Sequence, residues 1–221
     1  MSPDRGWIDP YAGMHGRRLF VAVPIPAEAS AAVADVVDRV RAQGLPTGAR
    51  DVRWVRLDGL HLTLRFLGPT PEMRIPPTID AVRRAAASTG AIDAVLAGAG
   101  TFPPGGRPRA LWIGLADGAD TLGTLAGSVS RELAEAGWPM DDRPFRAHLT
   151  LARSDGISVG RLVADRLVDA MAGRRIACRI DRLGLFESVT GGGPARYVPI
   201  ESVELAAQPE TGSPVYHRDG P

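Results

Sequence analysis

The sequence predicts an α+β fold with two similar lobes, in which antiparallel sheets line a central groove and helices cover the outside. Three observations lead to this prediction. Short apolar runs typical of strands alternate with segments whose apolar residues recur at helical spacing. The order of these segments repeats once, about ninety residues later. Gly- and Pro-rich loops occupy equivalent places in the two copies, where each joins a pair of strands.

The first copy predicts a strand, a helix, two strands, a second helix and a long strand. In the first helix, valines at positions 33, 36, 37 and 40 mark one apolar face. The second helix follows a Pro-rich entry, where proline is tolerated. The predicted elements of this copy are 18–24, 27–43, 52–55, 60–67, 75–87 and 92–102.

The second copy keeps the same order and adds a final strand. Its predicted elements are 110–115, 122–136, 148–152, 159–171, 176–186 and 197–205. Three pairs of residues mark equivalent places in the two copies: Phe20 with Trp112, His61 with His148, and Phe102 with Phe186. A pseudo-twofold relation between the lobes would place the two histidine strands side by side across the groove.

The repeat indicates one domain at 17–206, with repeat halves at about 18–105 and 106–206. The segments 1–16 and 207–221 are expected to be flexible ends, because neither has apolar periodicity. The chain has no apolar run long enough to cross a membrane, and its start lacks the apolar core of a signal peptide.

Composition excludes several kinds of function. A net charge of +1 argues against an extended surface for nonspecific duplex binding. All 26 basic residues are arginine, so a Schiff-base lysine or a P-loop lysine is excluded. Cys178 is the single cysteine, which excludes an intramolecular disulfide and a cysteine-based metal cluster. We therefore expect a cytoplasmic protein that makes no contact with membranes.

The sequence His-Leu-Thr-Leu occurs once in each copy, beginning at His61 and at His148. Side chains two residues apart on a strand point to the same face, so each histidine shares a face with Thr63 or Thr150. Two imidazoles can supply the acid and the base for cleaving a phosphodiester. The threonine hydroxyls can donate to the non-bridging phosphate oxygens. The pair predicts acid–base chemistry on a phosphate.

A metal site is the competing use of two histidines, and it would need further ligands. No acidic residue shares the histidine face of either strand, whereas strict alternation places Arg65 there. A guanidinium would repel a cation and attract a phosphate. We therefore expect no metal. Arg153 is a second candidate for phosphate binding, although it reaches the face of His148 only if the strand ends or bulges.

Three aromatic residues are candidates for stacking on a terminal base. Phe20 and Trp112 occupy equivalent opening strands, and Tyr197 follows a run of three glycines. Packing in the core is the alternative role for each of them.

The twin motifs HLTLRFLG and HLTLAR resemble the paired signatures of the two-histidine (2H) phosphoesterases. The segments RLFVAVPIP, RPRALWIG and RPFRAHLTLAR resemble, more narrowly, the RNA 2′,3′-cyclic phosphodiesterases, also called the 2′-5′ RNA ligase family. The resemblance extends from about residue 18 to residue 205. It implies a bilobal α+β fold and hydrolysis of a terminal 2′,3′-cyclic phosphate to a 2′-phosphomonoester.

By the same resemblance, His148 would be the proton acceptor that activates water, and His61 the proton donor to the departing 3′ oxygen. The pseudo-symmetry leaves the reverse assignment open. The resemblance also implies that the reaction needs no metal and no nucleotide cofactor. RNA ends or cyclic-phosphate nucleotides are the expected partners, and we expect a monomer.

Three alternatives remain open from the sequence. The same site could join RNA ends through a 2′-5′ linkage. It could instead hydrolyse a small cyclic phosphodiester such as ADP-ribose cyclic phosphate. A third alternative is a module that binds RNA ends without turnover.

Overall fold

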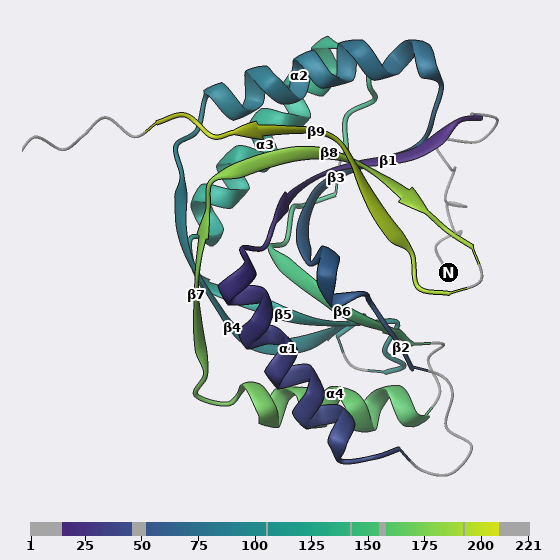
Figure 1. Cartoon of the computed structure of the whole chain (residues 1–221), viewed down its shortest axis with the longest axis vertical. Helices are drawn as coiled ribbons and strands as arrows, with labels where there is room; N and C mark the ends of the chain where they lie inside the picture. Colours follow the sequence, from purple (N-terminus) through teal and green to yellow (C-terminus); the bar gives the residue numbers. More distant parts are fainter. Residues whose placement is uncertain are drawn as a thin grey trace, which may run out of the picture.

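The computed structural model describes residues 15–45, 52–104, 106–141, 143–154, 158–191 and 193–207. The predicted flexible ends, 1–16 and 207–221, lie almost entirely outside these residues. Within them the chain forms two antiparallel sheets, one with four strands and one with five. The predicted α+β fold with two sheet-based lobes is confirmed (Figure 1).

The four-stranded sheet has the order β3-β1-β8-β9. Its strands are β1 (Arg17–Pro24), β3 (His61–Thr70), β8 (Arg182–Val189) and β9 (Arg196–Glu204). β1 is a central strand, and its residues from Leu19 to Val23 are all buried. Such a continuous apolar run is expected for a strand that is covered on both faces.

The five-stranded sheet has the order β2-β6-β5-β4-β7, so β2 and β7 are its edges. Its strands are β2 (Val52–Trp54), β4 (Ile92–Phe102), β5 (Ala110–Asp117), β6 (His148–Ser154) and β7 (Arg175–Ile180). β4 and β5 are joined by the Gly- and Pro-rich loop that the sequence predicts between paired strands.

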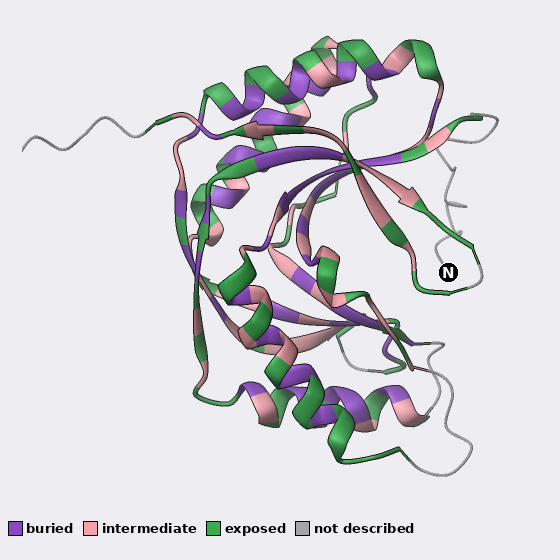
Figure 2. Ribbon diagram, viewed as in Figure 1, coloured by how far each residue is buried: buried purple, intermediate pink, exposed green. Residues whose placement is uncertain are grey.

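Two helices pack on the outer face of each sheet (Figure 1). The helices are α1 (Ala27–Ala42), α2 (Ile75–Ala87), α3 (Ala119–Glu135) and α4 (Ser158–Met171). α2 and α3 cover the four-stranded sheet, and α1 and α4 cover the five-stranded sheet. Their buried residues face the sheets and their exposed residues face outward (Figure 2). No helix in the described ranges combines the length and the apolar character that a membrane span requires.

Each sheet takes strands from both halves of the chain, so the halves 18–105 and 106–206 are not separate lobes. β4 comes from the first half but pairs with β5, whereas β8 comes from the second half and pairs with β1. In the sequence repeat, Phe102 at the end of β4 corresponds to Phe186 in β8. The two halves have thus exchanged equivalent strands, and the lobes are interleaved.

The sequence prediction of one strand over 176–186 is wrong. The chain forms β7 and β8 there, in different sheets, with Asp181 between them. β7 pairs with β4, whereas β8 pairs with β1 and β9. The Asp181 carbonyl accepts the amide of Leu205 at 2.8 Å, which marks the crossing point between the sheets. An apolar run does not reveal this change of sheet, because both strands are buried on one face.

Candidate active site

His61 and His148 are the first residues of β3 and β6, and these two strands contact each other where the sheets meet (Figure 1). The Nδ1 atom of His61 lies 2.7 Å from the Gly59 carbonyl oxygen, and that of His148 lies 2.7 Å from the Arg146 carbonyl oxygen. A carbonyl oxygen only accepts, so each Nδ1 donates a proton. Nε2 is therefore left to accept or donate a proton in chemistry.

Thr63 and Thr150 follow the histidines by two residues, as the motif requires. Both are half-buried, whereas Leu62 and Leu149, which separate each histidine from its threonine, are fully buried. Within the described residues, no protein group hydrogen-bonds to either threonine hydroxyl. Each motif therefore presents an imidazole and an available hydroxyl on one face, and anchors the opposite face in the core.

Each histidine strand contains a β-bulge directly after its threonine. In β3, Thr63 pairs with Ala22 and Arg65 with Val21, which leaves Leu64 without a partner residue. In β6, Thr150 pairs with Trp112 and Ala152 with Leu111, which leaves Leu151 unpaired in the same way. A bulge inserts one residue and so reverses the alternation of side chains beyond it. The sequence repeat thus extends to an irregularity of the backbone.

The bulges reverse the predicted placement of the two arginines. Ala152 is fully buried and Arg153 is exposed, so Arg153 lies on the face of His148. Arg65 does not share the face of His61; its place there is taken by Phe66. The Arg65 side chain is 3% exposed, donates to the Pro139 carbonyl and forms an ion pair with Asp141 at 3.3 Å. The expectation for Arg65 from strict alternation is therefore wrong.

Aromatic rings surround His61. The Phe20 ring centroid lies 4.8 Å from that of His61, and the Tyr197 ring lies edge-on to the imidazole at 4.6 Å. Burial lowers the pKa of His61 below its usual value. The hydrogen bond with the Gly59 carbonyl opposes this shift, and the positive charge of Arg153 adds to it. Arg153, although carried by the other sheet, is thus close enough to act on His61.

The aromatic candidates differ in what they can offer a ligand. Phe20 is only 2% exposed, beneath the rings of Phe66, Phe186 and Tyr197. Its position favours support of His61 rather than stacking on a base. Tyr197 is half-buried and closer to the surface.

Trp112 lies on the histidine face of the five-stranded sheet. Its ring covers Gly100 and Gly114, and a Cβ atom at Gly100 would lie 2.6 Å from it. The indole Nε1 is buried without a hydrogen-bond partner among the described residues. Glycine is thus required beneath this ring for steric reasons.

Two phenylalanines beside the histidines were not among the predicted site residues. Phe102 contacts His148 edge-on at 4.9 Å, and Phe186 faces His61 at 6.4 Å. Each follows a glycine by two residues, Gly100 and Gly184, in a Gly-x-Phe pattern that both copies carry. The Phe186 ring lies over Gly184 just as the Trp112 ring lies over Gly100. This repeated Gly-x-Phe pattern is the feature of the sequence from which the two phenylalanines could have been predicted as site residues.

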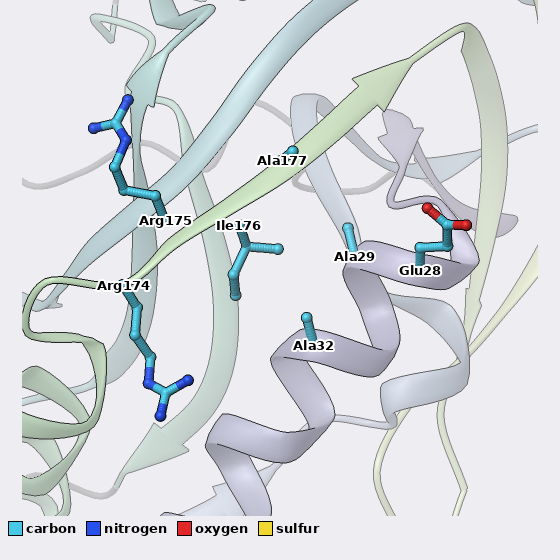
Figure 3. A pocket seen from close by; sticks show the side chains of 7 residues that line it. All are labelled: Glu28, Ala29, Ala32, Arg174, Arg175, Ile176 and Ala177. Atoms are coloured by element: carbon cyan, nitrogen blue, oxygen red, sulfur yellow. The ribbon is translucent and has the colours of Figure 1, made fainter.

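A cavity that the structure outlines lies elsewhere, between α1 and β7 (Figure 3). Ala29, Ala32 and Ile176 form its apolar wall. Glu28, Arg174 and Arg175 line it as well, and the two arginine side chains extend in different directions (Figure 3). Since no residue of the two histidine motifs lines this space, the histidine strands remain the better candidate site. Among the described residues, no group of three or more His, Cys, Asp or Glu side chains could hold a metal ion.

Comparison with known sequences agrees with the twin motifs. Residues 21–192 match the model of the 2′-5′ RNA ligase superfamily. An RNA 2′,3′-cyclic phosphodiesterase of Thermus thermophilus is 36% identical over 144 residues, which cover 62% of this chain and 68% of that protein. One from Geobacillus stearothermophilus is 34% identical over 135 residues, 61% of this chain but only 41% of the relative.

Solved structures give the same result. A crystal structure of a Thermus thermophilus protein superposes with a TM-score of 0.67 at 27% identity, covering 86% of this chain and 99% of that one. Escherichia coli LigT in complex with 3′-AMP superposes with a TM-score of 0.63 at 26% identity, covering 86% and 98%. The repeated histidine motifs, the interleaved sheets and these matches together show that the chain belongs to the 2′-5′ RNA ligase superfamily.

Proposed function

We propose that the protein hydrolyses the terminal 2′,3′-cyclic phosphate of RNA or oligonucleotides to a 2′-phosphomonoester, with His61 and His148 as its acid–base pair. One observation carries the proposal. Two equivalent strands each present an imidazole that is fixed through Nδ1, with Nε2 available and a free threonine hydroxyl beside it. The names of the relatives support the same activity.

In the proposed reaction, the neutral imidazole takes a proton from water as the water oxygen bonds to phosphorus. The protonated imidazole gives its proton to the 3′ oxygen as the bond between phosphorus and that oxygen breaks. The products are a 2′-phosphomonoester and a free 3′ hydroxyl. We assign His148 as acceptor and His61 as donor. Thr63, Thr150 and Arg153 would stabilise the charge that develops on the phosphate oxygens.

The test is turnover of a short RNA that ends in a 2′,3′-cyclic phosphate, measured in the presence of EDTA. We expect the 2′-phosphomonoester as product. ADP-ribose cyclic phosphate as a second substrate tests the small-molecule alternative. RNA halves incubated without ATP test 2′-5′ joining. Binding of RNA ends without any turnover would contradict the proposal and favour a binding module.

Replacing either threonine by valine should slow the reaction without unfolding the protein. Valine keeps the shape of the side chain and removes the hydroxyl, so one hydrogen bond to a charged oxygen is lost. We expect Thr63→Val and Thr150→Val each to lower kcat about 10- to 100-fold. The matched control is Thr124→Val, because that hydroxyl bonds to the Asp120 carbonyl within α3. A loss in the control as large as in the site variants would contradict the assignment.

The pH dependence of kcat/KM should report the lowered pKa of His61. One limb of the profile should lie below pH 6.5, the usual value for histidine. Arg153→Gln removes a positive charge, so the pKa of His61 rises and that limb moves upward. If His61 is the donor, activity is lost as pH rises through its pKa, and the alkaline limb moves. If it is the acceptor, the acid limb moves. Limbs that stay in place would contradict the proximity of Arg153 to His61.

We also propose that the protein is monomeric and acts in the cytoplasm. Cys178 is free and buried, and burial raises the pKa of its thiol to about 11. A single unreactive thiol suits a reducing compartment. Analytical ultracentrifugation of the purified chain tests the monomer.

A further inference from the structure

The two histidines occupy equivalent places in the repeat but have unequal surroundings. Among the described residues, the His148 ring contacts one aromatic ring, that of Phe102. The His61 ring contacts three, those of Phe20, Phe186 and Tyr197. Tyr197 is the nearest of the three, with 4.6 Å between the ring centroids. The inequality centres on this tyrosine, because the two phenylalanines beside His61 have aromatic equivalents in the second copy.

The reach of the outer strands explains this difference. In the four-stranded sheet, β9 pairs with β8 on both sides of Phe186, so that Tyr197 lies opposite Ser188. The corresponding outer strand of the five-stranded sheet is β7, which pairs with the equivalent strand β4. That pairing ends at Ala97, before Phe102 is reached. Within the part of the chain that the structure describes, β7 therefore supplies His148 with no counterpart of Tyr197.

The Tyr197 ring packs beside both partners of the hydrogen bond that orients His61. It lies nearly perpendicular to the imidazole, with 80° between the ring planes. A Cβ atom at Gly59 would lie only 3.4 Å from the Cδ2 atom of Tyr197. The Gly59 carbonyl is the group to which Nδ1 of His61 donates at 2.7 Å. Phe20 in turn supports Tyr197, in a perpendicular contact with 5.3 Å between the centroids.

We infer that Tyr197 is a positioning residue for His61: its ring holds the imidazole in the orientation in which Nδ1 donates to Gly59 and Nε2 is left for proton transfer. One hydrogen bond fixes a single atom of the imidazole, whereas a ring packed beside it also restrains the plane. A tyrosine does this at low entropic cost, because its side chain has only two torsions. The inference rests on the proposed function, and in it Tyr197 acts through His61 rather than on the substrate.

The first test is a pH titration of His61 by NMR, on protein labelled with nitrogen-15 at its histidines and without substrate. The signal of His61 is identified by its absence from His61→Ala. Burial lowers the pKa of His61. We expect Tyr197→Leu to raise this pKa, because water enters where the ring stood and stabilises the charged imidazole. The ring nitrogen shifts should also change from the tautomer protonated at Nδ1 to a mixture of tautomers.

The second test is the kinetics of the same variants on a nucleoside 2′,3′-cyclic phosphate. We expect Tyr197→Leu to lower kcat about 10-fold with KM unchanged, since a misplacement of about 1 Å can cost about 10²-fold. Tyr197→Phe restores the ring and should return the pKa, the tautomer and the rate. Val198→Ala is the matched control, because neighbouring side chains of a strand point to opposite faces. A higher KM with the His61 pKa unchanged would place Tyr197 on the substrate and overturn the inference.

The titration separates this inference from the hydrolytic function, because it needs no turnover. If Tyr197→Leu shifts the pKa and the tautomer of His61 in a protein that hydrolyses nothing, the positioning role stands and the proposed function fails. If hydrolysis proceeds but His61 titrates identically in wild type and Tyr197→Leu, the inference fails while the proposed function survives. Circular dichroism checks that each variant is folded. Tyr197→Met, whose unbranched side chain adapts to irregular gaps, takes the place of a leucine variant that does not fold.

Discussion

His61→Ala and His148→Ala should each lower kcat for a cyclic-phosphate RNA end by about 10²- to 10⁴-fold, the usual contribution of one acid or base. Each variant removes the only Nε2 atom that its strand presents. Neither loss should come from unfolding, because both rings are half-buried at the first residue of a strand. Single-turnover kinetics measures the chemical step directly.

The double variant gives the sharper result. Residues that act on one transition state are not additive, so the loss in the double variant should be smaller than the product of the two single losses. His15→Ala is the matched control, since His15 is exposed and lies outside both motifs. A double variant that retained full activity would remove the basis for the mechanism.

Asp141→Asn should destabilise the protein by about 3 kcal/mol, because it removes a carboxylate that pairs with the buried guanidinium of Arg65. The Arg65 side chain is 3% exposed, so water cannot replace the lost carboxylate. We place the effect at the lower end of the range for buried pairs, since Asp141 is 23% exposed and Arg65 keeps its bond with the Pro139 carbonyl. Urea unfolding followed by circular dichroism measures the change.

Replacing the other partner of the ion pair, Arg65, should destabilise the protein less. Arg65→Met removes the buried charge itself, and Asp141 keeps Arg143 at 2.9 Å, so we expect a loss of about 1 kcal/mol or less. Asp93→Asn is the control, because it breaks an exposed pair that is worth at most about 1 kcal/mol. Equal losses for Asp141→Asn and Arg65→Met would show that burial of the Arg65 charge is not the cause.

This ion pair joins the two histidine strands. Arg65 belongs to the strand that begins with His61, and Asp141 lies in the segment that leads into the strand of His148. Activity measured on folded Asp141→Asn should therefore fall as well, because the relative position of the two imidazoles depends on this link.

The fold class and the placement of the two histidines on contacting strands could be predicted, because each depends on a local pattern. The His-x-Thr pattern predicts an imidazole and a hydroxyl on one face of a strand. Its second occurrence, at the equivalent position of the repeat, favours a shared role over a chance match. The exchange of β4 and β8 could not be predicted, because an apolar run has no mark that identifies its partner strand. The change of sheet at Asp181 was hidden for the same reason.

The two bulges explain why strict alternation predicted the wrong face of the strand for Arg65 and Arg153. In the second motif, Leu151 is followed by Ala152, and two adjacent apolar residues are a weak sign that alternation has been interrupted. In the first motif, Arg65 takes the second of these positions. An arginine is normally expected to be exposed, so the sequence carried no indication of two adjacent buried positions at Leu64 and Arg65. The guanidinium of Arg65, which the sequence offered as a phosphate ligand, instead forms an ion pair with Asp141.

The exchange of strands between the halves has a consequence for any attempt to divide the protein. A gene cut between residues 105 and 106 would yield two fragments, and each would lack inner strands of both sheets. Neither fragment could bury its own apolar face, so order would return only when the two recombine. We therefore expect the duplicated chain to unfold as one cooperative unit, and not as two tandem modules that melt separately.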